Sequence, residues 1–185
     1  KSSIRLLTPI VQQRIKEGTN SFGDMIFPDF VERFGLEDFK TSVRALEVFT
    51  AACSSEFAVR PFIVRYPQEM MRQMLEWSKH KSEHVRRLAS EGCRPRLPWA
   101  MALPEFKKDP RPVLKVLENL KSDTSEYVRR SVANNLNDIS KDNLEVALQT
   151  AERWFGKNKA TDALVRHALR NELKKGNKRA LALFA

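Results

Sequence analysis

Two copies of one motif decide the fold: Ser82-Glu83-His84-Val85-Arg86-Arg87-Leu88-Ala89 and, 43 residues later, Ser125-Glu126-Tyr127-Val128-Arg129-Arg130-Ser131-Val132. A weaker third copy reads Asp162-Ala163-Leu164-Val165-Arg166-His167-Ala168-Leu169. A serine followed by an acidic residue favours a helix start, because the serine can cap free N–H groups and the acid suits the positive end of the helix dipole. Each copy is therefore predicted to begin a helix, and the chain to be built from repeated helical units.

Outside these copies, apolar residues also recur at the 3.6-residue period of an α-helix, and glycines and prolines interrupt the pattern at short intervals. A period of about 40–47 residues with paired helices is typical of HEAT and armadillo arrays. We therefore predict an all-α fold, a HEAT-like helical repeat solenoid. It forms one domain over residues 1–185, with an N-terminal cap at about 1–38 and repeats at about 39–185.

The charge is unevenly distributed. The net charge is +10 at pH 7, and residues 1–78 hold ten basic and ten acidic residues. Residues 79–130 hold thirteen basic and seven acidic residues, and residues 157–185 hold eight and two. Basic blocks of this kind favour an anionic partner such as nucleic acid.

Equivalent positions of stacked repeats line up along one surface. The motif arginines are therefore predicted to form a basic concave face that binds DNA: Arg86, Arg87, Arg129, Arg130 and Arg166. The alternative is that these arginines pair with neighbouring acids, as they do in HEAT proteins that bind other proteins. Arg94 and Arg96, which flank Pro95, are predicted to lie in a loop, either against DNA phosphates or as solvated charges.

Several other classes of protein are disfavoured. No apolar run is long enough for a membrane helix, so no membrane partner is expected. Two cysteines without a CxxC spacing make a disulfide framework improbable and suit a reducing cytosol. His80-Lys81-Ser82-Glu83-His84 matches the HxxEH zinc pattern, but a cap at Ser82 would leave His80 in a loop, so no metal site is predicted.

Three runs carry a resemblance to a known family: Ser55–Phe62, Val128–Lys141 and, most specifically, Arg87-Leu88-Ala89-Ser90-Glu91-Gly92-Cys93-Arg94-Pro95-Arg96-Leu97-Pro98-Trp99. They resemble the DNA alkylation-repair glycosylases of HEAT-like fold, the AlkC branch more than AlkD. The resemblance covers about residues 25–180. It implies a glycosylase that acts on double-stranded DNA with alkylated bases in the bacterial cytosol. No lysine is well placed to form a Schiff base, so a monofunctional enzyme is predicted, and we expect a monomer that needs no cofactor.

The resemblance also implies a site formed by Glu56, Glu91, Asp138 and Trp99. A base alkylated at a ring nitrogen is cationic and leaves readily, so carboxylates are needed to stabilise the sugar cation and to aim a water. Asp138 or Glu91 is the candidate for positioning water, with Glu56 in support. An aromatic face at Trp99 suits a cationic lesion.

Each of these residues also has a structural alternative. Glu56 could be a first-turn helix acid, Asp138 could form an Asx turn at a helix end, and Trp99 could pack over a loop. Glu91, near a helix C-terminus, is harder to explain structurally, because the dipole disfavours an anion there. Two other functions remain open, a non-catalytic nucleic-acid-binding module and a protein-interaction scaffold.

Overall fold

The computed structural model describes residues 2–185, and Lys1 of the predicted N-terminal cap lies outside the described residues. Every regular element of residues 2–185 is a helix. In chain order these are α1 (Ser2–Glu17), η1 (Phe22–Met25), α2 (Ile26–Phe34), α3 (Phe39–Phe49), α4 (Val59–Arg65), α5 (Pro67–Trp77), α6 (Glu83–Gly92), α7 (Pro104–Lys108), α8 (Arg111–Leu120), α9 (Glu126–Asp142), α10 (Leu144–Trp154), α11 (Lys159–Ala168), α12 (Arg170–Lys174) and α13 (Lys178–Ala182).

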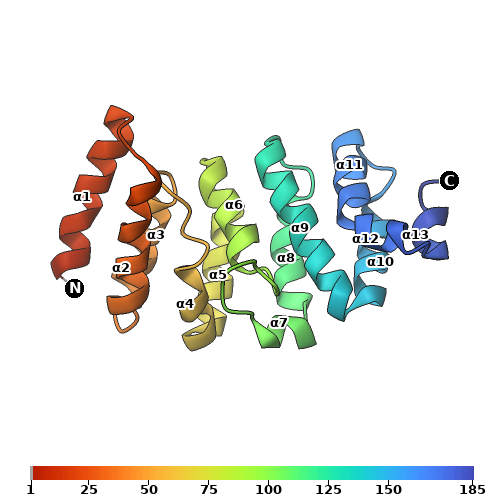
Figure 1. Cartoon of the computed structure of the whole chain (residues 1–185), viewed down its shortest axis with the longest axis horizontal. Helices are drawn as coiled ribbons and strands as arrows, with labels where there is room; N and C mark the ends of the chain where they lie inside the picture. The colour runs from red at the N-terminus through yellow and green to blue at the C-terminus, as the bar shows by residue number, and fades with distance from the viewer. Residues whose placement is uncertain (1) are drawn as a thin grey trace.

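The helices form one row that runs from α1 to α13, with the two chain ends at opposite ends of the row (Figure 1). Within it, α9 packs between α6 and α11, while α5 and α8 pack against α6, and α8 and α10 against α9. The three motif copies are thus three stacked helices, α6, α9 and α11. The prediction of an all-α repeat solenoid is confirmed.

The motif serines define the starts of two helices, though not by the expected contact. Ser82 and Ser125 are the N-cap residues of α6 and α9, with extended backbone angles, but neither side chain caps its own helix. Ser125 Oγ instead donates to Glu83 Oε2 in the preceding repeat. Because Ser82 precedes α6, His80 lies in the connection before it, as predicted.

The core is continuous along the row. Leu88, Val128 and Leu136 are fully buried between the stacked helices, and burial of such a side chain contributes about 1.5–3 kcal/mol. Trp77 and Trp154 are also buried, as predicted, and their indole N–H groups donate to glutamates at 2.6 and 2.7 Å. No helix of residues 2–185 is long and apolar enough to cross a membrane.

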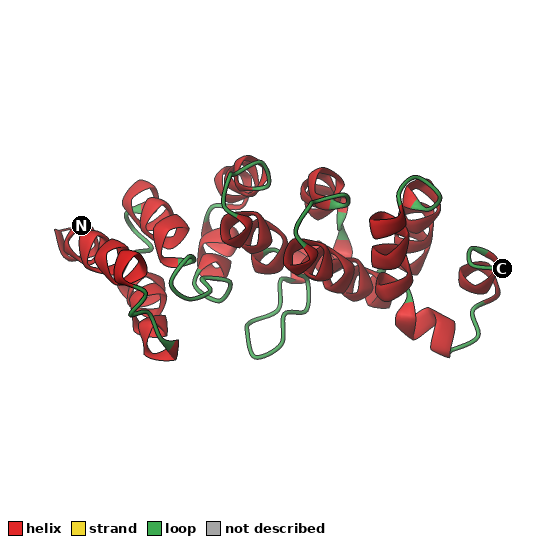
Figure 2. Ribbon diagram, turned by 90° about the horizontal axis from the view of Figure 1, so that it is seen from above, coloured by secondary structure: helices red, strands yellow, loops and turns green. Residues whose placement is uncertain are grey.

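One loop stands out from the row of helices (Figure 2). It connects α6 to α7 and carries Trp99, which is 99% exposed and has a left-handed φ of +63°. The alternative that Trp99 packs over a loop is therefore wrong. Both legs of the loop are held by the fully buried Arg60, which donates to the carbonyls of Gly92 at 3.0 Å and Met101 at 2.7 Å.

Candidate active site

The three predicted carboxylates lie in one row, joined by two arginines. Arg87 Nη1 is 2.8 Å from Glu56 Oε2, and its Nη2 is 3.5 Å from Glu91 Oε1. Arg94 Nη1 is 2.7 Å from Glu91 Oε1, and its Nε is 2.8 Å from Asp138 Oδ2. This carboxylate row, Glu56–Glu91–Asp138, crosses the α3–α4 connection, α6 and α9. The fold brings together residues that are 82 positions apart in the chain.

The buried carboxylates Glu91 and Asp138 each accept two hydrogen bonds, whereas the more exposed Glu56 accepts one from Arg87. Glu91 Oε2 accepts from Ser131 Oγ at 2.6 Å, and Lys141 Nζ lies 2.9 Å from Asp138 Oδ1. Both carboxylates are buried, at 6% and 1% exposure. Glu56 is half-buried, and its Oε1 accepts no hydrogen bond from residues 2–185. Glu56 therefore keeps an open oxygen for a ligand or a water.

Local structure explains how an anion is tolerated at Glu91. This residue lies in the last turn of α6, where the helix dipole opposes negative charge. Arg87 and Arg94, four residues before and three after it, supply the compensating cations. Burying a carboxylate at this helix end costs free energy even when it is paired. The presence of Glu91 is therefore better explained by function than by a contribution to stability.

The structural alternatives for the other two carboxylates are wrong. Asp138 lies inside α9, four residues before its end, and so forms no Asx turn. Glu56 precedes α4, whose N-cap is Ala58, so it is not a first-turn helix acid. Both positions are set by contacts across the repeats rather than by local helix signals.

Trp99 and Glu56 share a cleft of about 580 Å³. The walls come from η1 and from the α3–α4 connection, with Phe22, Phe57 and Cys53 among the lining residues. Burial, reinforced by Asp24 and Glu56, raises the pKa of the Cys53 thiol to about 11. The thiol is therefore protonated at neutral pH, and Glu56 is the charged side chain among the residues that line this cleft.

The predicted DNA-binding arginines divide into two sets. The first arginine of each motif, Arg86 or Arg129, donates to backbone carbonyls five and six residues earlier. Arg86 also pairs with Asp123 at 2.6 Å. Arg166, in the third copy, lies 5.3 Å from the centre of the Phe184 ring. These three arginines therefore also make contacts within the fold, and their part in a basic DNA-binding face stays a prediction.

The second arginine of the first two motif copies has different surroundings in each copy. Arg87 joins the carboxylate row and lies 5.2 Å from the centre of the Tyr127 ring. Arg130 is exposed, and only a long contact of 3.4 Å ties it to Glu126. Of the two loop arginines, Arg94 is buried within the row instead of solvated, and Arg96 pairs with Asp142 at 2.6 Å.

Two residues that contact the carboxylate row, Lys141 and Ser131, are not among the site residues predicted from the sequence. Lys141 follows Asp138 at the helical spacing of three residues, a signal that the sequence does carry. Ser131 lies seven residues before Asp138 but contacts Glu91 and Ser90 on α6. Its role depends on how α6 and α9 stack, which the local sequence does not specify.

Comparisons with known proteins place this geometry in a family. The family model described as DNA alkylation repair enzyme matches residues 47–171, which include the whole carboxylate row. The chain is 55% identical over 160 residues to "Uncharacterized protein YhaZ" of Bacillus subtilis (strain 168), covering 86% of the chain and 45% of YhaZ.

A solved structure is similar along the entire chain. It is titled Pseudomonas fluorescens alkylpurine DNA glycosylase AlkC bound to DNA containing an abasic site analog, with 43% identity and a TM-score of 0.92. The match covers 100% of this chain and 50% of that one, so the chain spans about half the length of the relatives it matches. The chain belongs to the DNA alkylation repair enzyme family, and within it to the AlkC branch.

Proposed function

We propose that this chain is a DNA glycosylase that hydrolyses the N-glycosidic bond of alkylated, positively charged bases such as 3-methyladenine, and so initiates base excision repair. The observation that carries the proposal is the carboxylate row beside the exposed Trp99, in a family of DNA alkylation repair enzymes. The solved structure of AlkC bound to DNA supports duplex DNA as the partner. With DNA as its substrate, the chain would act in the bacterial cytosol.

The reaction suits a site with several carboxylates. The bond between C1′ and the base nitrogen breaks, and its electron pair neutralises the positive charge of the base. A water oxygen then bonds to the cationic C1′, and the proton that the water loses passes to a carboxylate or to solvent. The products are the free base and an abasic site. Carboxylates stabilise an oxocarbenium-like sugar and orient the water.

The three carboxylates differ in their access to substrate. Glu56 has an open oxygen and shares its cleft with Trp99, so we assign it the first contact with the sugar or with the attacking water. Glu91 and Asp138 share Arg94, and they meet a water only where that ion pair loosens. Trp99 would lie against the lesion, where an aromatic face attracts the cationic base.

We also propose that the enzyme is monofunctional. A lyase reaction needs a neutral amine to form a Schiff base. Lys141 is close to the row, but its ammonium group is paired with Asp138 at 2.9 Å. Reduction with borohydride during the reaction is expected to trap no covalent complex with DNA, and a trapped complex that disappears in Lys141→Met would contradict this proposal.

The function is tested by release of free 3-methyladenine from methylated duplex DNA. The wild-type chain should release the base, and Glu56→Gln, Glu91→Gln and Asp138→Asn should each lower the rate at least about 100-fold. Glu152→Gln, which changes an exposed ion-paired glutamate on α10, is the matched control and should keep the wild-type rate. Duplex binding without base release would favour the binding-module alternative.

A further inference from the structure

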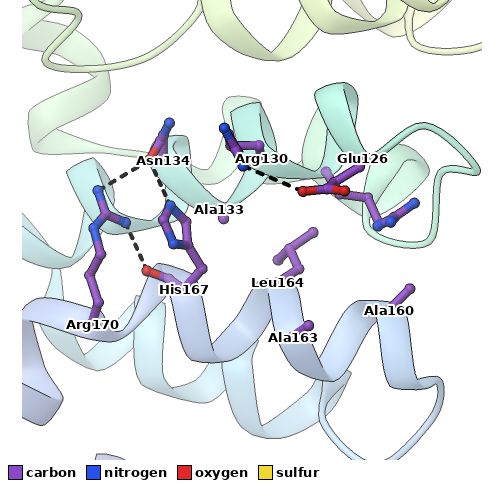
Figure 3. Close-up of a pocket in the computed structure, with 10 residues that line it drawn as sticks. Glu126, Arg130, Ala133, Asn134, Ala160, Ala163, Leu164, His167 and Arg170 are labelled. Atoms are coloured by element: carbon purple, nitrogen blue, oxygen red, sulfur yellow. Dashed lines mark hydrogen bonds and ion pairs between the residues drawn. The ribbon is translucent and has the colours of Figure 1, made fainter.

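A groove between α9 and α11 carries an excess of positive charge (Figure 3). Its volume is about 610 Å³, and it lies on the same helices as the motif copies. The charged and titratable lining residues are Glu126, Arg129, Arg130, His167 and Arg170. Among them only Glu126 carries a negative charge, so the groove favours an anion.

The repeat register relates this groove to the carboxylate row. Asn134 follows Glu91 by 43 residues, and Arg130 follows Arg87 by the same interval. The groove is therefore the counterpart of the row in the next repeat. The next repeat has the amide of Asn134 at the position equivalent to Glu91. The cations around Asn134 therefore have no carboxylate at that position to neutralise them.

Arg170 is the strongest indication of a missing anion. Its Nη1 donates to the carbonyl of His167 at 2.7 Å, and its Nη2 donates to Asn134 Oδ1 at 3.1 Å. No carboxylate of residues 2–185 forms an ion pair with it, although Asp138 acts on it through space. A half-buried guanidinium held by neutral acceptors alone retains its full charge for a ligand.

Asn134 is oriented by the same contacts. Its Oδ1 faces both Arg170 and His167, whose Nε2 lies 3.3 Å away (Figure 3). Its Nδ2 therefore points away from these two side chains and donates no hydrogen bond to residues 2–185. Burial lowers the pKa of His167, and the charges of Arg170 and Arg130 lower it further, as expected in a positive field.

We infer that this groove is a phosphate subsite, in which Arg130, Asn134 and Arg170 bind a phosphodiester of the DNA backbone beside the carboxylate row. The inference rests on the proposed function in one respect, that the partner is DNA. Guanidinium groups match phosphate oxygens geometrically, and a free amide adds a directed donor. The carboxylate of Glu91 in one repeat would then take part in catalysis, while the amide of Asn134 at the equivalent position of the next repeat binds the DNA backbone.

Equilibrium binding of an undamaged fluorescent duplex, measured against salt concentration, tests the subsite without any need for turnover. Asn134→Asp keeps the shape of the side chain and adds a negative charge, so it should weaken binding at low salt at least about 10-fold by repelling the phosphate. Arg170→Gln and Arg130→Gln should each reduce the slope of log K against log salt by about 0.9, the loss of one phosphate contact. Arg130 is exposed, so its variant folds even where a change at Arg170 disturbs the packing.

Arg179→Gln is the control, because Arg179 is exposed on α13 and paired with Glu145 and Glu152. It should keep the wild-type slope. A wild-type slope in Arg130→Gln together with wild-type affinity at low salt in Asn134→Asp would overturn the subsite, whereas a wild-type chain that binds no duplex would overturn the proposed function instead. Inorganic phosphate should displace the duplex no better than chloride at equal ionic strength. Tight binding of inorganic phosphate to the free chain that Asn134→Asp abolishes, with duplex binding unchanged, would assign the groove to free phosphate and overturn the DNA assignment.

Discussion

Arg94 links Glu91 to Asp138: its Nη1 lies 2.7 Å from one carboxylate and its Nε lies 2.8 Å from the other. All three side chains are buried. Glu91 comes from the end of α6 and Asp138 from the interior of α9, so the guanidinium ties two repeats together at the site. The same contact that aligns the carboxylates also neutralises them.

The first prediction concerns that guanidinium. Arg94→Gln would leave two buried carboxylates without a shared cation, and we expect it to lower the free energy of unfolding by about 3–5 kcal/mol. Arg96→Gln is the control, because its ion pair with Asp142 is more exposed and should contribute about 0–1 kcal/mol. Urea denaturation of both variants measures the difference, and equal midpoints would contradict the role assigned to Arg94.

The second prediction concerns the anchoring of the Trp99 loop. Arg60→Met removes both hydrogen bonds that hold the legs of the loop, so Trp99 should become more mobile and base release should slow. Because Trp77 and Trp154 are buried, the fluorescence that acrylamide quenches comes mainly from Trp99, and the anisotropy of this quenchable part reports on the loop. We expect lower anisotropy at unchanged quenching.

Arg65→Met, on the exposed side of α4, is the control for Arg60 and should leave the fluorescence unchanged. A slower Arg60→Met enzyme with wild-type anisotropy would show that the loop is held by other contacts.

The third prediction is a pH dependence of stability at the brace between repeats. Burial raises the pKa of Asp123, but the hydrogen bonds from Arg86 and from the backbone N–H of Ser125 outweigh it, so the net shift is downward. A lowered folded-state pKa stabilises the fold above the unfolded value of about 3.9, and this contribution is lost as pH falls through the folded-state pKa.

Asp123→Asn should therefore lower the free energy of unfolding by about 2 kcal/mol at pH 7 and make little difference near pH 2. Asp109→Asn, at an exposed ion pair on the surface, is the comparison and should have a small effect at both pH values. A deficit in Asp123→Asn that stays constant with pH would contradict the proposed brace.

The fourth prediction is that DNA binding takes up a proton at His167. The pKa of His167 lies below its ordinary value because of burial and the charges of Arg170 and Arg130, and Glu126 is the carboxylate that lines the same groove. A bound phosphate favours the imidazolium and raises that pKa. Duplex affinity should therefore increase as pH falls from about 7.5 to about 5.5.

His167→Gln should flatten this pH dependence while keeping the binding at pH 7.5. If the variant kept the wild-type pH profile, the titrating group would lie elsewhere and the proton linkage at His167 would be disproved.

Much of the fold is predictable from the sequence because its signals are local. The three motif copies, the apolar periodicity and the proline breaks are enough to place α6, α9 and α11 and to predict a solenoid. The carboxylates Glu56, Glu91 and Asp138 are found together only through the resemblance to a family, since Glu56 and Asp138 each have an ordinary structural explanation when taken alone. Their arrangement in one row comes from the stacking of repeats.

The arginines show what the sequence leaves undetermined. Arg86 and Arg87 are neighbours in the motif. Arg86 donates to a backbone carbonyl in the connection before α6, whereas Arg87 pairs with a carboxylate of the row. Adjacent helical positions point about 100° apart, so a small rotation of the helix decides which of them faces the site. The partner of Arg96 is Asp142, 46 residues away, and no local pattern identifies it.

The central claim is tested most directly by the single-turnover rate of base release from methylated duplex, with duplex binding measured on the same samples. We predict that the wild-type chain releases 3-methyladenine and that Glu91→Gln binds the duplex as tightly but releases the base at least about 100-fold more slowly. Equal rates for the wild-type chain and Glu91→Gln would contradict the account, because the base would then leave without help from the central carboxylate of the row.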